Sequence, residues 1–390
     1  MDTGVELRKF VVPEVIIGDG ASLLINRYIG HFASKKPMVV TDKIIRTQPW
    51  FEDIVILMES VVEEVIIFDD VTENPKDYEA MLGAELFLSH DCDLIVAIGG
   101  GSPMDCAKCI SIVSTNGGHI LDYEGVDEIN LPGPPLICIP STAGTAADVS
   151  QFAIVTDSKS LIKKAIISKK VVPDLALIDP VPLMTMDSYL MACTGMDALT
   201  HAIEAYVSNA QSPMTDIHAL EAIRLVNKYL EKAVASKADI TLLSQLLLAS
   251  THAGFAFSNA SLGAVHAMAH SLGGLLNLAH GECNSIILSE VIRINFSAAP
   301  ERYRHIACAM GLPVAHEAEE VVKNVLIDRI NGLRVNLGIS GRIYVPSKTN
   351  SLILKLVETA QNDPCMVTNP RALKDEEVGG LFEKIIAESE

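Results

Sequence analysis

The order of short apolar runs in the first half of the chain is the feature that most constrains its fold. Runs rich in valine and isoleucine alternate there with segments of helical periodicity, such as Tyr78–Ser89 and Pro103–Val113. The runs that predict strands are Met38–Thr41, Val65–Phe68, Leu94–Ile98, Leu136–Ile139, Phe152–Val155 and Leu175–Ile178. Because buried strands that alternate with helices form sheets covered on both faces, we predict an α/β domain with a mainly parallel sheet.

The alternation stops after the proline-containing segment Ile178–Pro182. Helical patterns then follow almost to the end of the chain, at Tyr189–Asn209, Met214–Ala233, Ile240–Ser258 and Ala264–Leu278. A chain of 390 residues is also longer than one hydrophobic core usually serves. We therefore predict two domains, an α/β domain over residues 1–182 and an all-helical domain over residues 183–390.

Composition and charge exclude several classes of partner and location. The 49 acidic residues against 30 basic ones give a net charge of −19, which argues against binding to nucleic acid or to an anionic membrane surface. Mean hydropathy is +0.31, but polar residues and three histidines interrupt the most apolar stretch, Leu242–His270. This stretch predicts buried helices and no transmembrane segment. The eight cysteines form no disulfide framework and the N-terminus is acidic, so we expect a cytoplasmic protein.

A glycine triplet follows one of the predicted strands. Leu94–Ile98 runs into Gly99, Gly100, Gly101 and Ser102, and a proline then opens a helix. Glycine backbone amides and a helix N-terminus together suit a phosphate group. The spacing differs from G-x-G-x-x-G, and a tight turn with nothing bound explains an isolated triplet equally well.

Two further strand ends favour a nucleotide site. The strand Leu136–Ile139 leads into the small and hydroxylated residues of Pro140–Thr145, and Asp42 ends another strand. In parallel sheets, ligands bind at the carboxyl ends of the strands. A carboxylate at Asp42 would accept hydrogen bonds from a ribose and repel a 2′-phosphate, which favours NAD over NADP, although Asp42 by itself also fits a turn.

Six of the eleven histidines lie between His201 and His280. Asp197 and His201 are four residues apart, as are His266 and His270, so each pair shares a helix face. Such a pair is also common as a simple hydrogen bond on a helix. Here the surrounding helices are apolar, where unpartnered imidazoles would be costly. One carboxylate and three imidazoles suit iron(II), zinc, nickel or manganese.

Several segments together resemble a known family. They are Gly99–Asp105, Pro140–Thr145, Gly195–Tyr206, His266–Gly274 and His280–Asn284, and they resemble the iron-dependent, group III alcohol dehydrogenases of the lactaldehyde reductase and 1,3-propanediol dehydrogenase type. The similarity runs in order along nearly the whole chain. It implies a dehydroquinate synthase-like architecture, with a dinucleotide-binding domain over residues 1–182 and a metal-binding catalytic domain over residues 183–390.

The resemblance also implies roles for individual residues. The metal ligands would be Asp197, His201, His266 and His280, whereas His270 would be an unligated catalytic histidine beside the substrate and the nicotinamide. Phe257 would line the substrate pocket. The implied cofactor contacts are Asp42, Asn74, Gly99, Gly100, Gly101, Ser102, Asp105, Ser141, Thr142, Thr145 and Lys163.

The predicted function is therefore reversible, NAD(H)-linked interconversion of a primary alcohol or small diol and its aldehyde. Iron(II) would be the metal, with zinc as an alternative, and a homodimer or larger homo-oligomer is expected from the resemblance. Two alternatives stay open. One is a zinc-dependent, glycerol-dehydrogenase-like polyol dehydrogenase, which the fourth ligand position at His201 disfavours. The other is a non-catalytic protein that binds NAD and metal.

Overall fold

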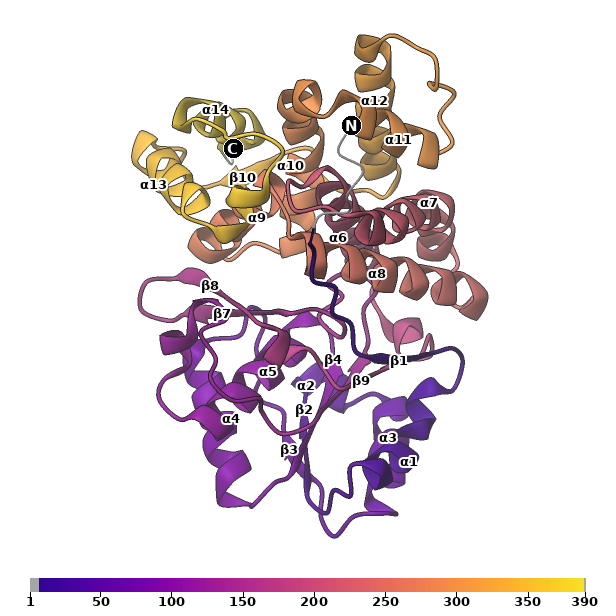
Figure 1. Cartoon of the computed structure of the whole chain (residues 1–390), viewed down its shortest axis with the longest axis vertical. Coiled ribbons are helices and arrows are strands. Elements are labelled where there is room, and N and C mark those ends of the chain that lie inside the picture. Colours follow the sequence, from indigo (N-terminus) through magenta and orange to yellow (C-terminus); the bar gives the residue numbers. More distant parts are fainter. Residues whose placement is uncertain (1–6, 389–390) are drawn as a thin grey trace.

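The computed structural model describes residues 7–388, and it has an α/β half below a largely helical half (Figure 1). The centre of the lower half is a six-stranded sheet in which every neighbouring pair is parallel. In spatial order its strands are β1 (Glu14–Ile17), β9 (Leu175–Ile178), β6 (Leu136–Pro140), β4 (Leu94–Gly99), β2 (Pro37–Val40) and β3 (Ile66–Phe68). The predicted parallel sheet is confirmed.

Helices cover both faces of this sheet. They are η1 (Ala21–Leu24), α1 (Ile25–His31), α2 (Lys43–Arg46), α3 (Pro49–Glu59), α4 (Asp77–Ser89), α5 (Gly101–Asn116) and η2 (Ile120–Tyr123). Val39 of β2 packs in the cluster that contains α1 and α3, whereas its neighbours Met38 and Val40 pack with α4 and α5. Successive side chains of a strand point to opposite faces, so a strand buried on both sides is apolar throughout, as this one is.

A second, smaller sheet lies beside the first. The run predicted as a strand at Phe152–Val155 is β7 (Phe152–Asp157), but it pairs antiparallel with β8 (Ile162–Ile167) and takes no part in the parallel sheet. Strand β5 (Gly125–Val126) completes this three-stranded sheet, and η3 (Lys169–Val171) leads from it to β9. Only part of β8 is buried, which fits the lysines in its sequence and explains why it was not predicted.

The second half is built mainly from helices. They are η4 (Pro182–Thr185), α6 (Ser188–Val207), α7 (Pro213–Ala235), α8 (Ile240–Ala260), α9 (Ala264–Leu276), α10 (His280–Asn295), η5 (Phe296–Ala298), α11 (Pro300–Ala309), α12 (Glu319–Asn336), α13 (Asn350–Gln361), η6 (Pro364–Thr368) and α14 (Asp375–Ile385). The half predicted to be all-helical also contains one short parallel pair, β10 (Ile343–Val345) with β11 (Ile386–Glu388).

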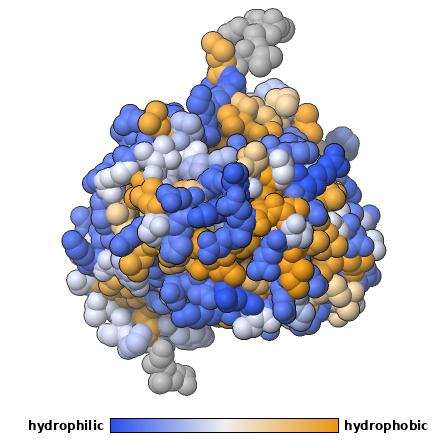
Figure 2. Space-filling view, turned by 90° about the horizontal axis from the view of Figure 1, so that it is seen from below, coloured by the Kyte–Doolittle hydropathy of each residue, from blue (hydrophilic) through white to orange (hydrophobic). Residues whose placement is uncertain are grey.

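Helix α8 belongs to the core of this half. Among residues 7–388 it is the one helix long and apolar enough to cross a membrane, and more than half of its most apolar part is buried. It packs against α6 and α7, with side chains such as Leu243 and Leu247 inside the core. The face of the molecule seen in Figure 2 carries apolar groups among hydrophilic ones.

Candidate active site

A cavity of about 740 Å³ lies between the two halves. On the α/β side it is lined by the segments that follow β2, β3, β4 and β6, which is where parallel sheets bind ligands. On the helical side it is lined by residues of α6, α8, α9 and α10. Except for Gly99, all residues predicted for the site line this one cavity: Asp42, Asn74, Gly100, Gly101, Ser102, Asp105, Ser141, Thr142, Thr145, Lys163, Asp197, His201, Phe257, His266, His270 and His280.

The glycine loop, which we define as Gly99, Gly100, Gly101 and Ser102, packs closely on the loop after β6. A Cβ atom on Gly101 would lie 2.9 Å from Cγ2 of Thr145, and one on Gly100 would lie 3.2 Å from Cγ2 of Thr142. Helix α5 begins at Gly101, so its free backbone amides lie at the edge of the cavity, where an anion can accept hydrogen bonds. Gly99 lies outside the cavity wall, and its φ of +150° makes the turn that leads into this loop.

Asp42 combines two positions that the sequence left as alternatives. It caps the N-terminus of α2, because its Oδ1 accepts hydrogen bonds from the backbone amides of Ile44 and Ile45, both at 2.9 Å. It also lines the cavity, together with Asp69 and Asp70 from the end of β3. This end of the cavity is therefore rich in carboxylates, which disfavours a bound phosphate at the same place.

One hydrogen bond and one close approach connect the halves across the cavity. Nδ2 of Asn74 donates a hydrogen bond to Oδ1 of Asn277 over 3.2 Å. Lys163 of β8 reaches α9, where a Cβ atom on Gly273 would lie 3.1 Å from its Nζ. Burial lowers the pKa of Lys163 and raises the pKa of Asp105 to about 7. Burial therefore favours the neutral form of each group.

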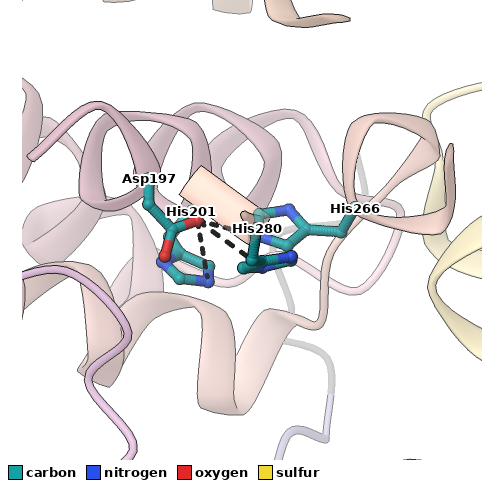
Figure 3. A group of neighbouring side chains, drawn as sticks. All are labelled: Asp197, His201, His266 and His280. Atoms are coloured by element: carbon teal, nitrogen blue, oxygen red, sulfur yellow. Dashed lines mark ion pairs between the residues drawn. The ribbon is translucent and has the colours of Figure 1, made fainter. Parts of the chain in front are cut away.

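Four side chains from three helices converge on the helical wall of the cavity (Figure 3). Asp197 and His201 lie one turn apart on α6, His266 lies on α9, and His280 begins α10. Oδ1 of Asp197 lies 3.9, 3.5 and 3.7 Å from the Nε2 atoms of His201, His266 and His280, respectively. Donor atoms bound to one ion at about 2.1 Å each are separated by about 3–4 Å, so this spacing matches a shared ion.

Asn284, one turn after His280 on α10, lies against this cluster. Its Nδ2 is 2.7 Å from Oδ1 of Asp197 and 3.1 Å from the Nε2 atoms of both His266 and His280. Its Oδ1 is buried and has no hydrogen-bond partner within the described part of the chain. The amide nitrogen thus lies against the atoms that would face a bound cation.

The protonation of the cluster follows from its burial and its charges. Burial by itself would raise the pKa of Asp197, but the nearby His201, His280 and His266 outweigh it and hold that pKa well below its ordinary value. Burial lowers the pKa of His201 to about 3. An ionised carboxylate together with three imidazoles is a donor set for a divalent ion such as iron(II) or zinc. The residues present therefore fit such an ion.

His270 and Phe257 lie beside the four-residue cluster. The ring of His270 stacks on that of His280 with centroids 5.2 Å apart, and its Nδ1 lies 2.8 Å from Oδ2 of Asp363. Phe257 stacks on His201 with centroids 4.2 Å apart. An imidazole and an aromatic ring thus border the space next to the candidate metal position.

Three polar residues at this site were not predicted from the sequence. Glu204 lies within the segment Gly195–Tyr206 and follows Asp197 by seven residues, so both side chains lie on one face of α6. This spacing could have identified Glu204 from the sequence. Asn284 follows His280 by four residues and offered the same kind of signal. Asp363 comes from η6, and no local pattern connects it with His270.

A parallel sheet whose glycine loop faces a carboxylate–histidine cluster across one cavity fits a metal-dependent oxidoreductase that also binds a dinucleotide. Comparison with known proteins supports this class of protein. The family described as iron-containing alcohol dehydrogenase matches residues 13–180, and the C-terminal part of the Fe-containing alcohol dehydrogenase family matches residues 191–386.

Individual relatives align over almost the whole chain. The NAD-dependent methanol dehydrogenase of Bacillus methanolicus is 36% identical over 383 residues, 97% of this chain and 99% of that protein. The 1,3-propanediol dehydrogenase of Citrobacter freundii is 36% identical over 377 residues, 96% of this chain and 97% of that protein. A crystal structure of a 1,3-propanediol oxidoreductase superposes with a TM-score of 0.93 at 34% identity, covering 97% of this chain and 100% of that one. The chain belongs to the iron-containing alcohol dehydrogenase family, as the sequence resemblance predicted.

Proposed function

We propose that this enzyme interconverts a primary alcohol or small diol and its aldehyde, with NAD(H) as the redox cofactor and iron(II) held by Asp197, His201, His266 and His280. The observation that carries the proposal is the convergence of these four side chains on the same cavity as the glycine loop. The relatives named above as NAD-dependent methanol dehydrogenase and 1,3-propanediol dehydrogenase support the cofactor and the substrate class.

Different groups at the site have different roles in the reaction. When bound, the ion supplies Lewis-acid polarisation of the substrate oxygen and the nicotinamide supplies the hydride acceptor. The backbone amides of Gly101 and Ser102 bind the pyrophosphate, and Asp42 accepts hydrogen bonds from the adenosine ribose. Phe257 shields the reacting carbon from water, and His270 exchanges a proton with the substrate hydroxyl.

We place the domain boundary at residue 182, between the two matched family ranges. We also propose that the protein forms a homodimer or a larger homo-oligomer and that it is cytoplasmic. Zinc suits the same donor set, so a zinc-dependent polyol dehydrogenase is the competing candidate.

Anaerobic purification, chelation and reloading test the proposal. The metal-free protein is reloaded with ferrous or zinc ions, and NADH oxidation is followed with short aldehydes and hydroxyaldehydes. We expect turnover that requires an ion and is highest with iron, and a His201→Ala variant should lose both ion and turnover, whereas a His218→Ala control should keep them. Full activity without any ion would refute the metal assignment. Stoichiometric NADH binding without turnover would favour the non-catalytic alternative.

A further inference from the structure

Asp363 joins the candidate active site from a distant part of the chain. It immediately precedes η6 and lies 93 residues after His270, beyond α13. Its Oδ2 is 2.8 Å from Nδ1 of His270. The two side chains are only 10% and 8% exposed, so little water competes for this hydrogen bond. The buried carboxylate of Asp363 therefore contacts a histidine that lines the cavity.

A further donor fixes the orientation of the Asp363 carboxylate. Its Oδ1 accepts a hydrogen bond from the backbone amide of Cys365 at 2.8 Å, which also caps η6. The thiol of Cys365 lies within 4.8 Å of the donor atoms of Asp363 and His270. Burial would raise the pKa of Asp363, but the adjacent His270 and the backbone amide of Cys365 outweigh it and lower that pKa. Asp363 is therefore an ionised acceptor in a fixed orientation.

A metal ion is the competing explanation for this group. Donor atoms of His270, Asp363 and Cys365 all lie within 4.8 Å of one another. Metals bind thiolates, however, and burial raises the pKa of the Cys365 thiol well above its ordinary value. That thiol therefore keeps its proton and is a poor metal ligand, so the hydrogen bond between His270 and Asp363 is the interaction that organises this group.

The hydrogen bond determines which nitrogen of His270 carries the proton. An ionised carboxylate can only accept, so Nδ1 of His270 must be its protonated nitrogen. In the neutral ring the lone pair then belongs to Nε2, on the opposite side from Asp363. Since His270 lines the cavity beside His280, this places a proton acceptor next to the candidate metal position.

We infer that Asp363 is a positioning residue for proton transfer, which holds His270 with Nδ1 protonated and Nε2 free to take the proton of the substrate hydroxyl. The inference rests on the proposed function. In alcohol oxidation the O–H proton passes to Nε2 while the C–H hydrogen leaves with its two electrons to NAD⁺, and the C=O bond forms. The resulting imidazolium is stabilised by Asp363. In aldehyde reduction the same proton returns to the oxygen.

An Asp363→Asn variant tests the inference, with iron content and melting temperature measured beside the steady-state kinetics. We expect kcat to fall about 10–100-fold, while the KM values for alcohol and NAD⁺ change less than about twofold and iron content is retained. Asp239→Asn is the matched control, because Asp239 caps α8 through the same type of backbone hydrogen bond. This control should leave kcat unchanged.

A double mutant separates positioning from a merely structural role. If Asp363 acts through His270, adding Asp363→Asn to a His270→Ala background should change kcat less than about twofold, because coupled residues are non-additive. Independent, multiplicative effects would overturn the inference, as would a wild-type kcat in Asp363→Asn. Loss of iron or of the fold in that variant would also overturn it, since Asp363 would then be structural. Absence of turnover in the wild-type protein would instead refute the proposed function.

Discussion

Nδ1 of His266 lies 2.6 Å from Oε2 of Glu204, so a buried carboxylate holds this ring on the side away from the cavity. The other oxygen of Glu204 accepts a hydrogen bond from the backbone amide of Val265 at 2.7 Å. Glu204 therefore connects α6 with the first turn of α9. It also leaves Nε2 of His266 facing Asp197, which is how carboxylates behind metal-binding histidines orient them.

Replacing Glu204 by glutamine should weaken ion binding. The amide retains one acceptor oxygen, so it cannot serve both the His266 ring and the α9 backbone. We expect iron affinity to fall about 10–100-fold, measured by competition with a chelator of known affinity. Glu221→Gln is the control, since Glu221 pairs with Arg224 near the surface of α7. Unchanged affinity in Glu204→Gln would contradict an orienting role.

Ion binding should release a proton. Burial disfavours charge on His266, but hydrogen bonds to Asp197 and Glu204 outweigh it and raise its pKa to about 9 in the ion-free protein. Burial lowers the pKa of His201 to about 3 and that of His280 well below its ordinary value. At pH 7.5 an incoming ion therefore displaces about one proton, from His266.

The sign of the pH dependence follows from the same displacement. Below pH 9 the competing proton becomes more available as the pH falls, so affinity should decrease about tenfold per pH unit between pH 8 and 6. Calorimetry in two buffers with different ionisation enthalpies gives the number of protons released. A value near zero, or affinity independent of pH, would contradict the prediction.

Gly281→Ala should displace His280, one of the four candidate metal ligands. A Cβ atom there would lie 2.5 Å from the backbone oxygen of Cys193, so α10 would have to move away from α6 and carry His280 with it. Overpacking of this kind costs about 1–3 kcal/mol, and we expect a lower melting temperature together with lower iron content. Gly332→Ala on α12, where the added carbon meets nothing within 4 Å, should be neutral or stabilising. Equal behaviour of the two variants would contradict the close contact.

Asp42→Ser should relax the preference for NAD. Serine retains the cap on α2, so stability should change by less than about 0.5–1 kcal/mol. The loss of a carboxylate at the ribose end removes the repulsion of a 2′-phosphate. The ratio of kcat/KM for NADPH to that for NADH should rise by about tenfold or more, corresponding to about 1.4 kcal/mol. An unchanged ratio would show that Asp69 and Asp70 carry the discrimination, and Asp239→Ser serves as the control for loss of a cap.

The parallel sheet was predictable because its buried strands are apolar throughout, as in Leu94–Gly99 and Leu175–Ile178. Strand β1 was missed because it is a short edge strand that mixes Glu14 with apolar residues. The antiparallel partner of β7 could not be predicted, since β8 owes its position to pairing with β7 and carries Lys163 toward the cavity. Pairing partners are a tertiary property that local periodicity does not encode.

Helical spacing and an apolar setting marked Asp197, His201, His266 and His270 alike, and only the family resemblance selected Asp197, His201, His266 and His280 as the candidate metal ligands. The i, i+4 relationship of Asp197 and His201 on α6 is local. The partner of His270 is not local, because only the packing of η6 on α9 brings Asp363 to it. Likewise, the contact of Gly101 with Thr145 depends on how two loops from different strands meet.

All four members of the cluster come from α6, α9 and α10, whereas the glycine loop belongs to the sheet. A hinge movement that separates the two halves and releases the bound nucleotide would therefore leave the four candidate ligands in place relative to one another. On the proposed function, we expect an ion bound there to stay with the helical half through many catalytic cycles and to be lost only when that half unfolds.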